Sequence, residues 1–318
     1  TDPSRDEDLR TLKEDHLKVF DFAALPVDFA DLFGTFSEIP EFEGAVAVDD
    51  AILFSKRAQP FVVRRSRSVK TWPAASWTEP MLRQKEGTSE VEMMLREGHS
   101  VFDPMSESQV TTLNGFLDTM TKVNSTHSFV LSDENLQNLP RLENDVSRPD
   151  FLPSDSELAA MLNYGPGGDI IPLHPEADHL ICTVLQGVKQ LALYPVSDGH
   201  RLYPWLPDVE ESDIFSLVDA SNIDYNKFPL MRGTTRFELE LGPGDQLFLP
   251  ALWWMEAKSV GKTVAVHHYL EVGDYPEKAA TVTEAMSAAL HDGAMKRDKY
   301  VEEREDSEPE EGEHEQGG

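Results

Sequence analysis

Residues 161–196, MLNYGPGGDIIPLHPEADHLICTVLQGVKQLALYPV, decide how the rest of the chain is interpreted. A strand pattern runs into the Gly/Pro tip at 165–168, and a short extended segment follows. Two β-rich runs come next, and the Gln-Gly pair at 186–187 between them is typical of a turn. Because residues two apart on a strand share a face, His174 and Glu176 are predicted to point to the same side. An imidazole and a carboxylate placed in this way form two corners of a facial metal site.

Lys189 lies in the second of these β-rich runs, in a strand that is otherwise apolar. A lysine that points into a barrel is expected to face an anion, because an unpaired buried charge is costly. Farther along, 241–254 reads LGPGDQLFLPALWW, which predicts a Gly-Pro-Gly-Asp turn, an apolar strand and two packed tryptophans. The segment VAVHHYL at 264–270 is the last strand pattern, so the β region is expected to end there.

In their order and spacing, these segments resemble the JmjC domain, the cupin-type barrel of iron(II)/2-oxoglutarate oxygenases. The small hydroxylase branch is the most similar; it includes the asparaginyl hydroxylase of hypoxia-inducible factor and the tRNA wybutosine hydroxylase. Further segments carry the resemblance: QPFVVR and TWPAASW within 59–77, LPRLENDV at 139–146, LYPWLP at 202–207 and DYNKFPL at 224–230. Together the matching segments cover most of the chain, from roughly 55 to 272.

The resemblance implies a mainly β fold, a double-stranded β-helix of the cupin or jelly-roll type, with helical additions at both ends. We expect a lead-in with a short helix at 1–56, the barrel at 57–273, a helical segment at 274–303 and a disordered acidic tail at 304–318. The local patterns predict an irregular lead-in over 21–56, strands at 59–65, 89–95 and 128–132, and helices at 76–87 and 109–123. The insertion at 197–236 is expected to lead back to the barrel, with its part at 205–219 lying over the surface near the mouth of the site.

The resemblance also implies which residues would hold the cofactors. His174 matches the first iron ligand, and Glu176 matches the carboxylate ligand. Lys189 matches the lysine that binds the far carboxylate of 2-oxoglutarate. Iron(II) and 2-oxoglutarate are therefore the expected cofactors if the site is active.

The chain departs from the family pattern at the third ligand. The family has a histidine where this chain has Met255, and a thioether is a poor ligand for iron(II). Other polar family positions are apolar here, namely Ile171 and Leu180, and the tyrosine expected near Val130 is absent. The parity of the corresponding strand in the family implies that His267 and Tyr269 point into the barrel and His268 points outside. His267 is then either a replacement ligand from the neighbouring strand or a hydrogen-bonded interior histidine.

Composition limits the classes of partner. The 28 basic and 58 acidic residues give a net charge of −30, which argues against general binding of nucleic acids. The run from Arg64 to Lys70 is the one candidate basic patch, and a solvated loop is the favoured interpretation. No apolar run reaches the roughly 18 residues of a membrane span. Cys182 is the single cysteine; we expect it to be a buried filler in a reducing, intracellular compartment, cytoplasmic or nuclear.

Two functions remain open at this stage. In the first, the iron and 2-oxoglutarate site has degenerated and the barrel is a protein-binding or structural module. In the second, the chain is an active iron(II)/2-oxoglutarate-dependent protein hydroxylase with an altered metal triad. A third option is a zinc or manganese site on His174, Glu176 and His267. Each implies a protein partner or substrate, and a homodimer through the C-terminal helices is also left open.

Overall fold

The computed structural model describes residues 36–97, 108–120, 127–154, 156, 158–176, 178–205 and 214–270. Several expectations concern residues outside these ranges. They are the short N-terminal helix, the helical segment at 274–303, the acidic tail at 304–318, and the dimer contact through the C-terminal helices.

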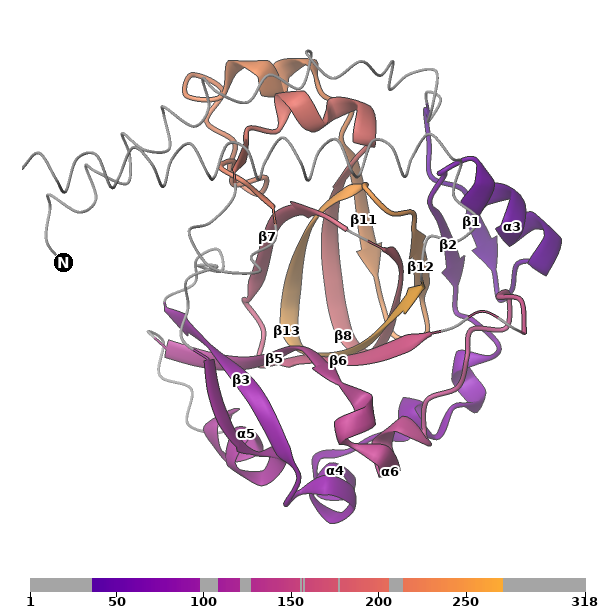
Figure 1. The fold of residues 1–318 in the computed structure, drawn as a ribbon, viewed down its shortest axis with the longest axis vertical. Helices are drawn as coiled ribbons and strands as arrows, with labels where there is room; N and C mark the ends of the chain where they lie inside the picture. Colours follow the sequence, from indigo (N-terminus) through magenta and orange to yellow (C-terminus); the bar gives the residue numbers. More distant parts are fainter. Residues whose placement is uncertain are drawn as a thin grey trace, which may run out of the picture.

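One large sheet of 11 strands curves around a common interior and forms the centre of the described chain (Figure 1). The strand order is β1-β2-β12-β8-β13-β6-β5-β3-β4, with β11 also paired to β8 and β7 to β13. The bounds are Glu41–Glu43 (β1), Phe61–Arg64 (β2), Glu90–Glu97 (β3), Ser108–Thr112 (β4), His127–Asn135 (β5), Ala159–Gly165 (β6), Ile170–Pro175 (β7), His179–Tyr194 (β8), Phe237–Leu241 (β11), Gln246–Leu249 (β12) and Trp254–Leu270 (β13). The predicted mainly β class, a cupin or jelly-roll barrel, is confirmed.

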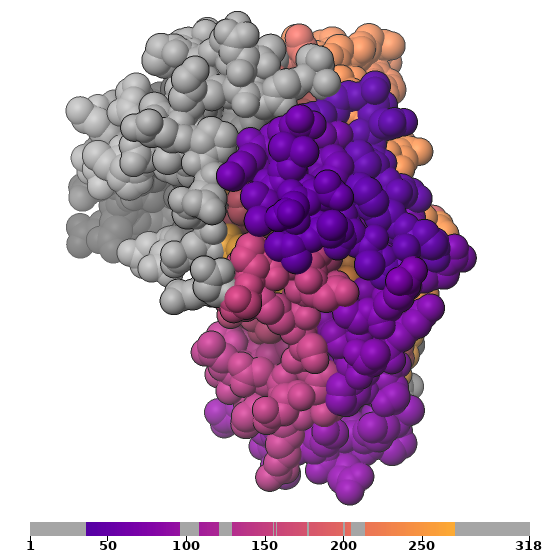
Figure 2. All heavy atoms as spheres, turned by 90° about the vertical axis from the view of Figure 1, so that its right-hand side faces the viewer, coloured from indigo at the N-terminus to yellow at the C-terminus, as the bar shows by residue number. Residues whose placement is uncertain are grey.

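Helices cover the outside of this barrel. Helix α3, Val48–Lys56, lies beside β1 and β2, whereas α4, α5 and α6 gather below β5 and β6 (Figure 1). Their bounds are Glu79–Glu86 (α4), Leu113–Met120 (α5) and Pro140–Glu143 (α6). The side view in Figure 2 shows the segments coloured indigo to magenta forming much of the surface, with the segments coloured orange mainly at its margin.

Short elements complete the described chain. The 3₁₀ helices are η2 (Val69–Thr71), η3 (Pro73–Ser76), η4 (Leu136–Asn138), η5 (Val196–Arg201) and η6 (Pro229–Gly233). In the insertion, β9 (Pro204–Trp205) and β10 (Phe215–Ser216) form a separate two-stranded sheet.

The predictions of single helices and strands are correct where the local sequence pattern is strong. They fail where pairing with a distant strand determines the secondary structure. Helix α4 ends at Gly87, as predicted, and the Gly87 amide donates to the Arg83 carbonyl at 3.1 Å. The lead-in was predicted to be irregular, but α3 forms there, with Asp49 and Asp50 favourably placed in its first turn. The helix predicted from residue 109 begins instead with strand β4, because this stretch pairs with β3.

The turn predicted at 186–187 is wrong, because β8 runs through it as one 16-residue strand. The two halves of β8 pair with different partners, β12 along the first and β11 along the second. Gly187 supplies the bend with a φ of +76°, and the partner strand β13 shifts register between Val260 and Val264. The chain therefore bends from one wall of the barrel to the other and does not reverse.

The interior of the barrel is mostly apolar. One buried cluster contains Leu180, Cys182, Leu193, Trp253 and Met255. Cys182 is buried and free, which confirms the prediction of a packed filler. Trp253 and Trp254 are both fully buried, so they are core residues, as predicted.

Candidate functional site

His174 and Glu176 lie together at the end of β7. The distance between His174 Nε2 and Glu176 Oε1 is 3.5 Å. His174 Nδ1 is 2.7 Å from the Pro172 carbonyl, which can only accept, so Nδ1 carries the proton and Nε2 faces the carboxylate. A metal-binding histidine is commonly oriented by this type of contact.

Two contacts hold the Glu176 backbone in place. The Glu176 amide donates to the Trp253 carbonyl at 3.0 Å, and the Leu252 amide donates to the Glu176 carbonyl at 2.7 Å. The insertion reaches this point too, because the Phe215 ring lies 5.8 Å from the ring of His174. The described part of the insertion therefore lies against the site, as the resemblance implied.

Met255 stands beside His174 in the ladder between β7 and β13. Its side chain is 2% exposed and belongs to the apolar cluster of the barrel. A bulge follows it on β13, between Met255 and Ala257. The position that the family gives to the second histidine thus contributes an uncharged thioether inside a hydrophobic core.

Lys189 points into the barrel from the second half of β8 and is 3% exposed. With Asn163, Ile171 and Ser259 it lines a cavity of about 10 Å³. Such a cavity has room for about one water molecule. Leu180, the second apolar residue at a position that is polar in the family, is fully buried.

His267 lies inside the barrel, as the strand parity predicts, and contacts a carboxylate that the sequence analysis missed. Its Nδ1 is 3.0 Å from Asp133 Oδ1, and the Asn163 side chain donates to the same oxygen at 2.9 Å. Burial lowers the pKa of His267, but Cys182 and Asp133 raise it more, to about 10. Partial removal from water raises the pKa of Asp133, but His267, Asn163 and Lys189 lower it, to about 2. Together these shifts describe an ion pair.

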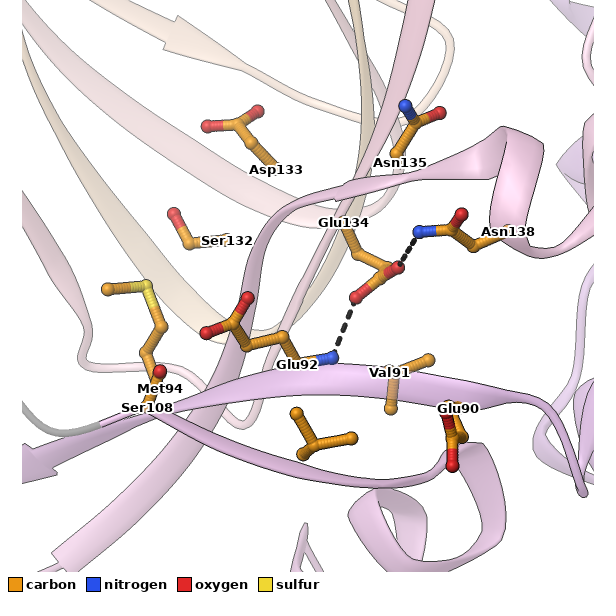
Figure 3. A pocket seen from close by; sticks show the side chains of 11 residues that line it. Glu90, Val91, Glu92, Met94, Ser108, Ser132, Asp133, Glu134, Asn135 and Asn138 are labelled. Atoms are coloured by element: carbon orange, nitrogen blue, oxygen red, sulfur yellow. Dashed lines mark hydrogen bonds between the residues drawn. The ribbon is translucent and has the colours of Figure 1, made fainter. Parts of the chain in front are cut away.

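A local irregularity of β5 directs Asp133 into the barrel. Its φ is +54°, and the pairing of β5 with β6 shifts register between Leu131 and Glu134. In Figure 3 Glu134 points toward β3, where it accepts from the Glu92 amide at 2.8 Å, whereas Asp133 points away from β3. The space between these strands is a hollow of about 450 Å³ lined by Glu92, Asp133 and Glu134, among others. No sequence signal marked Asp133, because the bulge depends on pairing between distant strands.

His179, three residues after Glu176, is a packed histidine. It is 5% exposed, and its Nδ1 accepts a hydrogen bond from the Ala251 amide at 3.1 Å. Burial lowers the pKa of His179 from 6.5 to about 4. The folded state therefore keeps the ring neutral at a pH where the unfolded chain already takes up a proton.

This difference predicts a loss of stability in acid. The contribution of His179 is fully present above pH 6.5 and is lost as the pH falls toward 4; at most it amounts to about 3 kcal/mol. We expect the unfolding free energy of His179→Asn, measured by urea titration between pH 7.5 and 4.5, to fall less steeply than that of the wild type. Asparagine retains an acceptor near the position of Nδ1. Parallel curves for the two proteins would contradict this assignment.

Two arginines of the basic run form ion pairs within the fold. Arg64 pairs with Glu41 and with Asp245, the latter at 2.9 Å, and Arg65 pairs with Glu43 at 2.7 Å. Arg67 and Lys70, from the same run, are exposed.

The comparisons with known proteins agree with this architecture. The cupin-like domain model matches residues 53–272. Lysine-specific demethylase 8 of Xenopus tropicalis is 25% identical over 202 residues, which cover 61% of this chain and 44% of that protein. The Jumonji C domain-containing protein 5 of Drosophila melanogaster is 27% identical over 219 residues, covering 64% and 53%. The human HSPB1-associated protein 1 is 32% identical over 151 residues, covering 46% and 30%.

This chain therefore belongs to the cupin-like, JmjC-type family of 2-oxoglutarate oxygenases. Members of the family generally depend on iron(II) and 2-oxoglutarate. The matches cover about half of the length of the first two relatives, 44% and 53%. Among the residues that the structure describes, no helix has the length and apolar character needed to cross a bilayer.

The residues present do not fit the iron and 2-oxoglutarate site of the family. Within the described ranges, no three His, Cys, Asp or Glu side chains converge so that they could hold a metal ion. His174 and Glu176 come together, but the neighbouring position is Met255 and His267 is paired with Asp133. The cavity lined by Lys189 is also far too small for a dicarboxylate.

Proposed function

We propose that this chain uses its cupin-like barrel as a protein-binding or structural module, with an iron and 2-oxoglutarate site that no longer functions. The observation that carries the proposal is Met255. It adjoins His174 in the strand ladder, is buried in the apolar core, and cannot replace an imidazole as a ligand for iron(II).

The cosubstrate end of the barrel supports the same proposal. Lys189 is retained, but Ile171 lines its small cavity where the hydroxylases have a hydroxyl group. Leu180 is buried in the apolar cluster in place of a family asparagine. A carboxylate ligand would therefore meet a lysine without the polar neighbours that the resemblance implies.

A protein is the partner that fits best. One relative, the human HSPB1-associated protein 1, is named for an association with another protein. The net charge of −30 disfavours nucleic acids and favours a partner with a basic surface. A single buried cysteine is consistent with a reducing, intracellular compartment, so that location is part of the proposal.

The metal content of the purified protein tests the proposal directly. We expect protein purified without chelators to contain well below one equivalent of iron, and to release no succinate from 2-oxoglutarate when iron(II) and ascorbate are added. The reason is that two protein ligands hold iron(II) far more weakly than three. Stoichiometric iron together with iron-dependent decarboxylation would show that the site is active.

A hydroxylase with an altered triad is the second candidate, because His174 Nε2 and Glu176 Oε1 still lie 3.5 Å apart. In that case His174, Glu176 and His267 bind the metal and Lys189 binds 2-oxoglutarate. The same three ligands would serve a zinc or manganese site. His267→Ala separates these cases: it abolishes binding of iron, zinc or manganese if His267 is a ligand, and leaves metal content unchanged if His267 serves only Asp133.

A further inference from the structure

A polar cluster inside the barrel is unexplained by the metal site. It consists of Asp133, Asn163, Lys189 and His267, which come from strands β5, β6, β8 and β13. The side chains of His267 and Asn163 both contact Asp133 Oδ1, at 3.0 and 2.9 Å. Asn163 also shares the lining of the small cavity with Lys189, which places that lysine in the same cluster.

The cluster has the composition of a site for an external carboxylate. One imidazole and one amide contact a single carboxylate oxygen of Asp133, and the ammonium group of Lys189 adds a positive charge nearby. The His267 ring is held through Nδ1, which contacts Asp133 at 3.0 Å, and Cys182 lies close enough to act on the same ring. The carboxylate in the middle belongs to the chain itself.

The backbone at Asp133 is strained in order to place this carboxylate. A φ of +54° is uncommon for a residue other than glycine, although aspartate and asparagine tolerate it better than most. The side chain keeps 37% of its surface exposed, so a small solute can reach the position from solvent. A strained and solvent-accessible carboxylate bound by buried donors resembles a tethered ligand.

We propose that Asp133 is an internal substitute for an external carboxylate ligand and closes a carboxylate-binding site formed by His267, Asn163 and Lys189. This inference rests on the proposed function, because it explains why a barrel that retains Lys189 does not take up 2-oxoglutarate. It predicts that removal of the Asp133 side chain opens a site for small carboxylates such as acetate, and for dicarboxylates that reach Lys189.

The test uses Asp133→Gly, because glycine accepts a positive φ and removes the carboxylate without added backbone strain. Thermal unfolding of the metal-free chain, with chelator present, is followed against acetate and 2-oxoglutarate, with chloride at equal ionic strength as the salt control. We expect a saturable rise in melting temperature of about 3 °C at ten times the dissociation constant for Asp133→Gly. The wild type should show none.

Matched variants separate the effect of removing the Asp133 charge from the effect of removing the volume of its side chain. Asp133→Asn tolerates the same φ and fills the same volume, so it should remain closed to carboxylates. Asp133→Gly combined with Lys189→Met should lose at least about tenfold in affinity for 2-oxoglutarate, because the cation for its far carboxylate is absent. Asp133→Ser is the second test variant if the glycine protein does not fold.

The inference is overturned if neither test variant binds a carboxylate, or if the wild type binds as well as they do. Neither result would bear on the proposed loss of the iron site, because these measurements are made without iron. Turnover of 2-oxoglutarate by the iron-loaded wild type would instead overturn the proposed function. The two failures are therefore distinguishable.

Discussion

Replacing Met255 by histidine is expected to raise the affinity for iron(II) by on the order of 100-fold or more, since it completes a set of three ligands. The backbone is already placed for this, because Met255 adjoins His174 in the β7–β13 ladder and Glu176 lies 3.5 Å from that imidazole. Iron(II) titration of chelator-treated protein under anaerobic conditions measures the change. The metal-free variant should be about 2 kcal/mol less stable, because it buries an imidazole among apolar side chains.

Met255→Leu is the matched control for this experiment. Leucine retains an apolar side chain of similar volume, so its unfolding free energy should change by less than about 1.5 kcal/mol and its iron affinity should not change at all. Equal iron affinities for the histidine variant and the leucine variant would show that position 255 does not face the metal site. Tight, stoichiometric binding of iron by the leucine variant would contradict the degenerate site.

Gly187→Ala is expected to have the largest effect on stability, a loss of about 3–5 kcal/mol. The residue has a φ of +76°, and a methyl group there would lie 2.3 Å from the Lys262 carbonyl oxygen. The clash falls where β8 and β13 bend together, so it cannot be relieved by moving one side chain. Urea unfolding monitored by tryptophan fluorescence gives the difference in free energy.

Two other glycines separate the causes of this effect. Gly261 has a φ of +68° but nothing within 4 Å of the added carbon, so Gly261→Ala should cost about 1–2 kcal/mol from backbone strain alone. Gly242 has neither a positive φ nor a near neighbour, and its substitution should stay within about 0.5 kcal/mol of the wild type. A Gly187→Ala variant no less stable than Gly261→Ala would refute the close approach of β8 and β13.

The sequence predicts the elements that short-range patterns determine. A run of β-forming residues identifies β2, alternation identifies β3, and Gly87 marks the end of α4, because these signals lie within the segment itself. The turn predicted from the Gln-Gly pair at 186–187 is wrong, because a glycine with a positive φ occurs both in turns and in bends within a strand. Only the pairing with β11, β12 and β13 decides between them, and that pairing connects distant residues.

In the candidate site, too, local patterns predict some positions correctly and miss the contacts between distant strands. Spacing on one strand correctly brings His174 and Glu176 together, and strand parity correctly turns His267 inward. The partner of His267 could not be predicted, because Asp133 reaches the barrel through a bulge and a left-handed residue. A polar stretch such as Ser132–Asn135 gives no sign of which side chain will point inside.

The continuity of β8 and β13 across both walls also bears on how this barrel can be altered. Each of the two strands carries site positions and structural positions on one unbroken backbone. Their many cross-strand hydrogen bonds fix where a side chain at 255 or 189 will point, whatever its chemistry. The backbone of the barrel thus fixes the positions of the site residues, and single side chains determine the reactivity. Substitutions of one residue at a time could therefore change the chemistry of the site while the fold stays the same.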